Sequence, residues 1–325
     1  MPDPKLYPFP RHSVEKTNHV YGPVPSRRLG FSLGVDLIPY KFCPLDCLYC
    51  QLGRTTRLTS RRADYVPVHD VLAELEATLR TVRAPDFITL SGSGEPTLHS
   101  GIGPLIDGIR KISRVPVAIL TNGVLLGEKD VQAGCLKADV VIPSLDAGDE
   151  EGYFRVNRPM AGLSFQSLVE GIRLFRGLFQ GEIWLEVMIL AGLTDSDVEV
   201  GKIASRAREI GPHKIHLNTA VRPPAEDSAR AVSFQELERI AAVFQPRAEV
   251  IFEPPAEKVS PGITMDKVLT ALERRPCTIQ DIALVSGISP VEVVKIVEGM
   301  MRENRIRRIL KSGRPYYAAP PEGTL

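Results

Sequence analysis

Three of the five cysteines lie close together, at Cys43, Cys47 and Cys50, with the spacing Cys-x3-Cys-x2-Cys. Cys135 and Cys277 stand far from this loop and from each other. A structural zinc site usually takes four protein ligands, whereas this loop supplies three. A cubane iron–sulfur cluster held by three thiolates keeps one iron open for an exogenous ligand. The spacing therefore favours a [4Fe–4S] cluster with reactive chemistry, and structural zinc or inert thiols are the alternatives.

Small and polar residues follow four of the apolar runs that are expected to form strands. In α/β barrels and open α/β sheets, ligands bind at the carboxyl ends of the parallel strands. Turns also require glycine, asparagine and serine, but four such turns in phase favour a site. These residues are 91–95 after the run 86–90, Thr121, Asn122 and Gly123 after 115–120, Ser144 and Asp146 after 139–143, and Asn218 after 214–217.

The elements that must position these residues alternate between apolar runs and longer segments with helical periodicity. This alternation predicts parallel strands joined by right-handed crossovers, with each strand buried on both faces. The expected strands are 31–38, 86–90, 115–120, 139–143, 182–189, 214–217 and 249–252. The expected helices are 68–82, 102–112, 129–137, 165–179, 196–210 and 234–244.

The pattern breaks after residue 252, and a length of 325 residues is typical of about two domains. We expect a barrel domain with an N-terminal extension at 1–252, a linker at 253–262 and a second domain at 263–325. In the second domain, three helices followed by a strand, a tight wing and a strand predict a winged helix-turn-helix. These elements are helices 265–274, 278–286 and 290–304, strand 306–310, wing 311–315 and strand 316–318.

The overall composition is that of a globular protein, with 43% hydrophobic and 24% charged residues and a net charge of +1. This small net charge gives no argument for binding to nucleic acid or membrane. Residues 1–23 lack an apolar stretch of signal-peptide length, and no run is long enough to span a bilayer. We expect a cytoplasmic location, where thiols stay reduced, and no membrane partner.

With its aromatic residue Tyr49, the cysteine loop resembles that of the radical S-adenosylmethionine (SAM) superfamily, and the resemblance covers residues 24–252. It implies a partial (β/α)6 barrel. The segment Ser93-Gly94-Glu95-Pro96 resembles the Gly-Gly-Glu segment that contacts the SAM amino group, with Ser93 replacing the first glycine. By the same resemblance, Tyr49 lies near the adenine. Further positions that the resemblance implies are Asn122, Ser144 and Asp146 beside the methionine and ribose, and Asn218 as a candidate for the adenine pocket.

The resemblance also implies the reaction and its cofactors. A [4Fe–4S] cluster would reductively cleave SAM to methionine and a 5′-deoxyadenosyl radical, which abstracts hydrogen from the substrate. The electron would come from a low-potential donor of the flavodoxin or ferredoxin type. No further catalytic residue can be named from the sequence.

Within the superfamily, the segments 21–28, 94–98 and 155–159 resemble Fe–S oxidoreductases related to the wyosine-forming tRNA enzymes. Those enzymes carry extra N-terminal cysteines, whereas no cysteine precedes Cys43 here. The resemblance favours modification of tRNA. Two alternatives are modification of a peptide or protein docked by the winged helix, and a redox-sensing Fe–S transcriptional regulator.

Arginines near the cysteine loop predict either a basic rim for a phosphate-bearing substrate or acidic redox partner, or a solvated surface. They are Arg27, Arg28, Arg54, Arg57, Arg61 and Arg62. Arg155 and Arg158 are candidates to hold the SAM carboxylate or the substrate, or to form surface ion pairs. Cys135 and Cys277 are expected to be structural.

Residues 263–325 carry ten basic and seven acidic residues, a net charge of +3 that is concentrated after residue 301. The expected recognition helix contains Glu292 and Glu298 and has no Arg, Asn or Gln in its first turns to read bases. We therefore expect no sequence-specific DNA binding. Binding to an RNA backbone, docking of a peptide or protein, and a packing role remain open.

Overall fold

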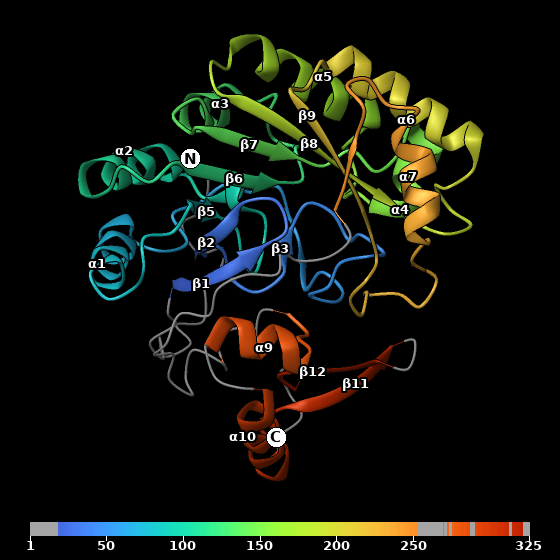
Figure 1. The fold of residues 1–325 in the computed structure, drawn as a ribbon. Coiled ribbons are helices and arrows are strands. Elements are labelled where there is room, and N and C mark those ends of the chain that lie inside the picture. Colours follow the sequence, from blue (N-terminus) through green and yellow to red (C-terminus); the bar gives the residue numbers. More distant parts are fainter. Residues whose placement is uncertain are drawn as a thin grey trace, which may run out of the picture.

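The computed structural model describes residues 19–251, 269, 272, 275–286, 290–311 and 314–320, and in this part the chain forms an eight-stranded sheet (Figure 1). All neighbouring strands are parallel except the edge pair β1–β2, which is antiparallel. The seven expected strands are confirmed, and β1 is an addition. In sheet order the strands are β1 (Val20–Ser26), β2 (Gly30–Val35), β5 (Phe87–Leu90), β6 (Val117–Thr121), β7 (Val140–Pro143), β8 (Glu182–Ile189), β9 (Lys214–Thr219) and β10 (Glu249–Val250).

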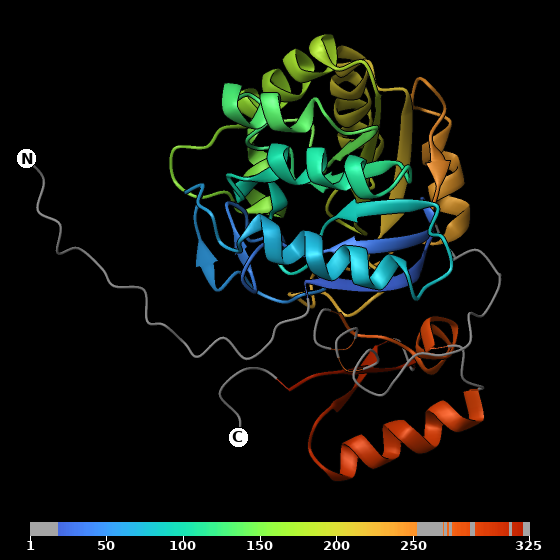
Figure 2. The ribbon, with the colours of Figure 1, turned by 90° about the vertical axis from the view of Figure 1, so that its left-hand side faces the viewer.

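Helices connect successive parallel strands and form a layer along the outer side of the curved sheet (Figure 2). Three of them begin at a serine whose hydroxyl caps the helix by accepting a backbone N–H: Ser164, Ser196 and Ser233. The six expected helices are confirmed, and α4 is an addition. The helices are α1 (Val68–Leu79), α2 (Ile102–Ile112), α3 (Lys129–Cys135), α4 (Glu150–Asn157), α5 (Phe165–Leu178), α6 (Asp197–Ile210) and α7 (Phe234–Ala241).

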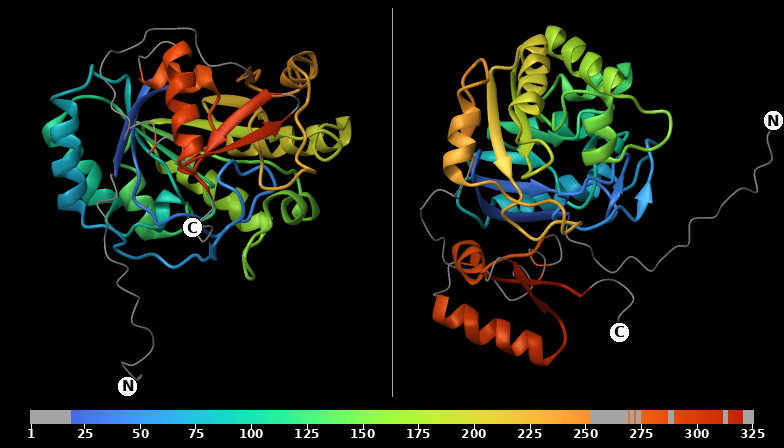
Figure 3. Two further views of the ribbon diagram at one scale, coloured as in Figure 1. Left: turned by 90° about the horizontal axis from the view of Figure 1, so that it is seen from below. Right: turned by 90° about the vertical axis from the view of Figure 1, so that its right-hand side faces the viewer.

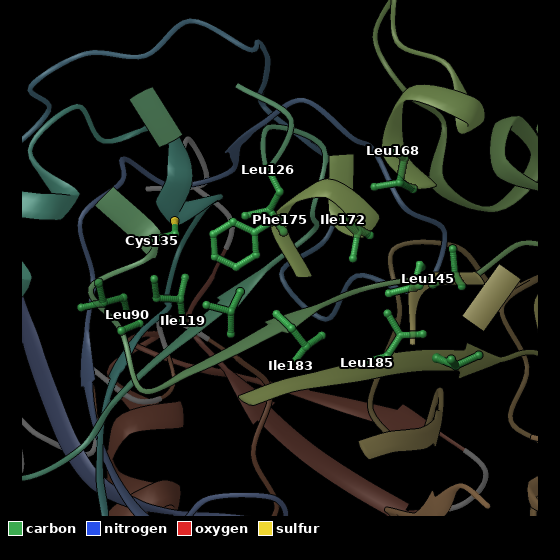
Figure 4. Packing of buried hydrophobic residues seen from close by; sticks show 14 of the residues in the cluster. Leu90, Ile119, Leu126, Cys135, Leu145, Leu168, Ile172, Phe175, Ile183 and Leu185 are labelled. Atoms are coloured by element: carbon green, nitrogen blue, oxygen red, sulfur yellow. The ribbon is translucent and has the colours of Figure 1, made fainter. Parts of the chain in front are cut away.

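The outer face of the sheet packs against the helices, and part of its inner face lines a cavity. On β8, Ile183 and Leu185 are fully buried and lie with Phe175 of α5 in the main hydrophobic cluster (Figure 4). The alternate residues Glu186 and Met188 line a cavity on the inner side of the sheet. The strand β7 is buried along its whole length, as expected of strands covered on both faces, whereas Glu186 and Met188 of β8 are only partly buried. Burial of the outer face stabilises the fold and leaves the inner face available for chemistry.

The C-terminal part has a second, smaller hydrophobic cluster that includes Cys277, Val293 and Val297. The expected linker 253–262 and most of the expected helix 265–274 lie outside the described residues. The expected helices 278–286 and 290–304 and the expected strands 306–310 and 316–318 are confirmed, with small shifts at their ends, whereas residues 312–313 of the expected wing lie outside the described residues. The confirmed elements are α9 (Ile279–Ser286), α10 (Pro290–Arg302) and the antiparallel pair β11 (Arg307–Lys311) and β12 (Arg314–Ala318).

This C-terminal part packs against the sheet domain, with α9 beside β1 and the β11–β12 hairpin beneath the barrel (Figures 1 and 3). Lys311 Nζ donates hydrogen bonds to the carbonyl oxygens of Ala220 (2.6 Å) and Arg222 (2.7 Å). The Tyr316 hydroxyl donates to the carbonyl of Val221 at 2.7 Å. The hairpin thus holds the segment that follows β9. Among the helices of the described residues, none is long and apolar enough to cross a membrane.

Candidate functional site

The cysteine loop follows β2 and is held in place by backbone contacts. Cys43 lies in the short strand β3 (Phe42–Cys43), which pairs with β4 (Arg57–Leu58). Within the loop, Cys50 N–H donates to the Cys47 carbonyl at 3.2 Å. Leu48 N–H donates to the carbonyl of Val156 near the end of α4, at 3.0 Å. The loop is thereby anchored on an element distant in the sequence.

Each of the three thiols accepts a hydrogen bond from a different side chain. Asn122 Nδ2 lies 3.4 Å from Cys43 Sγ, Asn157 Nδ2 lies 3.4 Å from Cys47 Sγ, and Lys41 Nζ lies 3.0 Å from Cys50 Sγ. The donors come from the loop after β6, the end of α4 and the residue before β3. Donors directed at all three sulfurs stabilise them as thiolates.

Burial raises the pKa of the Cys43 thiol to about 12 and that of Cys47 well above its ordinary value. Burial lowers the pKa of Lys41, but attraction to the three cysteine sulfurs, that of Cys50 above all, together outweighs burial, so the pKa is raised overall. These partly buried thiols would need a strong cation to become thiolates, and iron would supply that charge.

No group of three or more His, Cys, Asp or Glu side chains in the described residues converges to hold a single metal ion. A cubane cluster is larger than one ion, so its thiolate ligands lie around it and do not meet at one point. All three cysteines are free thiols and partly exposed. The donor set therefore fits a [4Fe–4S] cluster.

Asp146, after β7, connects the cysteine loop to the sheet. Its Oδ2 accepts hydrogen bonds from the Tyr49 hydroxyl and from Asn157 Nδ2, the latter at 2.8 Å. Its Oδ1 accepts from the backbone N–H of Met188 in β8 at 3.0 Å. Burial raises the pKa of Asp146 to about 6, although these hydrogen bonds oppose the shift. Tyr49 is thus fixed between the cysteine loop and β7.

Glu95 occupies the N-cap of a short 3-10 helix, η1 (Pro96–Leu98), after β5. Its Oε1 accepts from the Thr97 N–H (3.0 Å), the Thr97 hydroxyl (2.7 Å) and the Thr121 hydroxyl (2.6 Å). Its Oε2 accepts from the Asn122 N–H at 2.8 Å. Burial raises the pKa of Glu95, and these four hydrogen bonds oppose that shift. The Oε2 atom keeps capacity for one more donor, such as an amino group.

The neighbouring residues Ser93 and Gly94 have structural constraints of their own. The Ser93 hydroxyl and N–H both donate to Asp36, at 2.6 and 3.1 Å. A Cβ atom at Gly94 would lie 2.4 Å from the Ile38 side chain and 2.6 Å from the Phe42 carbonyl oxygen. Any larger residue at 94 would therefore displace the backbone that leads into Cys43.

A cavity of about 410 Å³ lies against the cysteine loop and the inner face of the sheet. Of the site residues expected from the sequence, six line it: Tyr49, Cys50, Gly94, Ser144, Asp146 and Asn218. The other five do not line it: Cys43, Cys47, Ser93, Glu95 and Asn122. Glu95 and Asn122 are nevertheless connected to the cavity wall through hydrogen bonds. Glu95 accepts one from the hydroxyl of Thr121, which lines the cavity, and another from the Asn122 N–H.

Asn218 belongs to a charged network in the cavity wall. Its Nδ2 donates to Glu186 Oε1 at 3.0 Å, and its Oδ1 accepts from Arg27 at 3.0 Å. Arg28 forms an ion pair with the same Glu186 oxygen. Burial would raise the pKa of Glu186, but attraction to Arg28 is among the effects that hold it below its ordinary value. Glu186 is thus a buried carboxylate at neutral pH.

The six arginines expected to form a basic rim separate into two groups. Arg27 and Arg28 line the cavity, and the other four do not. Arg54 pairs with Glu226, while Arg62 donates to the carbonyls of Thr97 and His99. The last two are Arg57, which lies over the Phe42 ring, and Arg61, which is exposed. A continuous rim of all six is therefore not formed.

Arg155 and Arg158 do not line the cavity either. Arg155 lies 3.7 Å from Glu199, and Arg158 lies 2.9 Å from Glu226. The residue between them, Asn157, reaches both Cys47 and Asp146. The two arginines were candidates to hold the SAM carboxylate, and their contacts with Glu199 and Glu226 argue against this role. The residue of this segment that faces the site is the buried Asn157.

Sequence reasoning missed three side chains of this site: Lys41, Asn157 and Glu186. Two of them had a signal in the sequence. Glu186 is an acidic residue within the apolar run 182–189, and Lys41 is a basic residue two positions before Cys43. Cys135 and Cys277 are fully buried in the two hydrophobic clusters, as expected of structural residues.

Comparisons with known proteins agree with this geometry. Residues 37–200 match the model of the radical SAM superfamily. The UPF0026 protein MJ1312 of Methanocaldococcus jannaschii is 31% identical over 317 residues, which cover 91% of this chain and 94% of that protein. A protein of Brachyspira hyodysenteriae named GTPase Obg is 35% identical over 308 residues; the match covers 93% of this chain but 45% of that protein, so this chain spans less than half of its length.

Among solved structures, anSMEcpe with bound AdoMet superposes with a TM-score of 0.51 at 15% identity, covering 77% of this chain and 70% of that one. At this identity the similarity concerns the fold alone.

Proposed function

The chain belongs to the radical SAM superfamily, and we propose that Cys43, Cys47 and Cys50 hold its [4Fe–4S] cluster with SAM bound beside them in the cavity. Enzymes of this superfamily use that cluster and SAM as cofactors. When bound and reduced, the cluster supplies the electron that cleaves SAM to methionine and a 5′-deoxyadenosyl radical. We assign SAM to the part of the cavity lined by Tyr49 and Asp146.

One observation carries this assignment: three N–H donors from separate elements point at the three loop sulfurs, and one of these cysteines, Cys50, lines the cavity. In this proposal Lys41, Asn122 and Asn157 orient the sulfurs and stabilise their negative charge. Asp146 fixes Tyr49 against the adenine, and Glu95 offers its remaining acceptor site to the SAM amino group. Ser144 and Asn218 complete the wall beside the bound cofactor.

The test is anaerobic reconstitution with iron and sulfide, reduction with dithionite and chromatographic assay of 5′-deoxyadenosine. Replacing Cys43, Cys47 or Cys50 by alanine should remove both the bound iron and the product. Cys135→Ala is the matched control, because Cys135 is buried in the core and its loss should leave iron content intact. A loop variant that still formed 5′-deoxyadenosine at the normal rate would overturn the assignment.

For the substrate we propose RNA, with tRNA first. The resemblance to tRNA-modifying Fe–S oxidoreductases supports it, and so does the presence of several arginines in the cavity wall. Protein purified without nuclease should carry RNA that absorbs at 260 nm and is released by salt. Copurification of one protein instead, with no RNA, would favour a peptide or protein substrate. Cluster binding without SAM cleavage or SAM binding would favour the redox-sensing regulator.

The C-terminal part suggests how a large substrate is presented. We propose a barrel domain at 1–252, a linker at 253–262 and a winged helix at 263–325, supported by the helix pair, the hairpin and their separate hydrophobic cluster. The winged helix would position substrate at the barrel, without reading a DNA sequence. We propose that a ferredoxin- or flavodoxin-type donor delivers the electron and that the enzyme works in the cytoplasm, where thiols stay reduced.

A further inference from the structure

Two charged residues of the C-terminal part, Arg275 and Asp281, line the same cavity as the proposed cofactor site. They face two arginines of the barrel domain, Arg27 from the turn after β1 and Arg222 from the segment after β9. Burial lowers the pKa of both Arg27 and Arg222 to about 10, and repulsion from Arg275 contributes in each case. The three guanidinium groups therefore interact with one another across the junction of the two parts of the chain.

The positive charge of this group is not balanced by the acidic residue beside it. Asp281 lies 3.9 Å from Arg222 and already accepts hydrogen bonds from the Thr278 N–H (2.9 Å) and hydroxyl (3.0 Å). The cavity wall has two other carboxylates: Glu186 is paired with Arg28, and Asp146 accepts hydrogen bonds from Tyr49, Asn157 and the backbone of Met188. Across the whole cavity wall, four arginines therefore exceed three carboxylates by one positive charge.

The remaining partners of these arginines are neutral acceptors. Arg222 donates to the side-chain oxygen of Gln51 at 3.1 Å, and Arg27 donates to Asn218 and to the carbonyl of Ile251, both at 3.0 Å. The charged neighbours of Arg275 in this group are the two arginines and Asp281. Neutral acceptors satisfy individual N–H groups and leave the net charge in place. Buried charge without a counterion is unfavourable unless an anion completes the site.

We infer that Arg27, Arg222 and Arg275 form a binding site for a phosphate group of the substrate, next to the proposed SAM site. Guanidinium groups bind phosphate through paired hydrogen bonds, and a phosphate monoester carries up to two negative charges. SAM itself is a poor match, because its sulfonium and amino groups outnumber its single carboxylate. The inference rests on the proposed function in one respect: it assigns the bound phosphate to the substrate that the 5′-deoxyadenosyl radical attacks.

The C-terminal hairpin makes this site rigid. Lys311 and Tyr316 hold the backbone carbonyls of residues 220–222, which fixes the segment that carries Arg222. Arg222 also contacts Gln51, the residue directly after Cys50. A phosphate bound here would therefore lie in the same cavity as the proposed cluster ligand. Preorganised donors bind an anion without a further ordering cost.

The test uses the full-length, reconstituted protein saturated with SAM and titrated by calorimetry. The probes are inorganic phosphate, ribose 5-phosphate, ribose, acetate and a 5′-phosphorylated ribotetranucleotide. We expect saturable binding of the phosphate-bearing probes and none of ribose. Arg275→Gln should weaken phosphate binding by about tenfold to a hundredfold, the usual effect of losing a hydrogen bond to a charged group. Arg275→Lys should weaken it less, and Arg208→Gln, an exposed arginine on α6, is the matched control.

Tighter binding of the tetranucleotide than of ribose 5-phosphate would support an RNA phosphate, and equal binding would support a small phosphorylated substrate. The inference is overturned if acetate binds as tightly as phosphate or if Arg275→Gln leaves phosphate affinity unchanged. It is also overturned if that variant weakens SAM binding by the same factor, since the arginine would then belong to the cofactor. Cleavage of SAM is measured separately, so a protein that cleaves SAM without binding phosphate refutes this inference alone.

Discussion

The replacement Asp146→Asn tests the electrostatics of the site directly. Asp146 is 3% exposed and accepts hydrogen bonds from Tyr49, Asn157 and the backbone of Met188. Burial raises its pKa from the ordinary 3.8 to about 6. The folded chain therefore binds this proton more tightly than the unfolded chain does. Ionisation of Asp146 should reduce stability as the pH rises between the two values.

The size of the effect follows from the two pKa values. Their difference corresponds to about 3 kcal/mol in the free energy of unfolding. Below about pH 4 the carboxyl is protonated in both states and this destabilisation is absent. Above about pH 6 it is ionised in both states and the destabilisation is complete. Asparagine has nearly the same shape and does not titrate, so its contribution is independent of pH.

The measurement is urea denaturation of the cluster-free wild type and Asp146→Asn across this pH range. All groups common to the two proteins cancel in the difference between their free energies of unfolding. Relative to the variant, the wild type should lose about 2 kcal/mol between about pH 4.5 and 7.5. Asp130→Asn, at an exposed position of α3, serves as the control for loss of one carboxylate. A difference that stays constant with pH, or that changes in the opposite direction, would refute the reasoning.

Four further replacements test other contacts. Lys41→Met should lower the iron retained after reconstitution, measured per chain, because it removes the cation beside one sulfur; equal iron would contradict its role. Glu95→Gln should destabilise the cluster-free chain by about 1–3 kcal/mol, measured in urea, because a carboxamide cannot accept all four hydrogen bonds. Leu185→Ala should cost about 2–5 kcal/mol by the same assay, whereas the exposed Leu178→Ala should stay within about 0.5 kcal/mol. Lys311→Met should speed proteolysis of the C-terminal part, since its two hydrogen bonds to the barrel domain are lost; unchanged cleavage would argue that they do not hold the hairpin.

The strands and helices of the barrel domain could be predicted because their signals are local. Apolar runs and helical periodicity are read within a window of about ten to twenty residues. The strand β1 was missed because Pro23 and Pro25 argue against a strand, yet prolines are tolerated at a sheet edge, where β1 lies. The helix α4 was missed because it has eight residues and few apolar positions, too short for its period to show.

The cysteine loop could be predicted for the same reason, since its residues are adjacent in the sequence. The side chains that hold its sulfurs could not, because Asn157 and Cys47 are 110 positions apart. Their contact exists only after α4 has packed beside the loop. The candidate roles of Arg155 and Arg158 show the limit of such reasoning. Being near the site in sequence does not determine which face of a helix a residue occupies.

The arginine cluster illustrates how the C-terminal part contributes to the site. Arg27 and Arg222 are partly buried and line the same cavity as Arg275, in a wall made by both parts of the chain. If the C-terminal part only stabilised the barrel, apolar contacts at this junction would do so without burying like charges. The chain instead places Arg275 opposite two other arginines and supplies one carboxylate. Repulsion of this kind is unfavourable in the free protein and would be offset by a bound anion, which is what the proposed phosphate site requires.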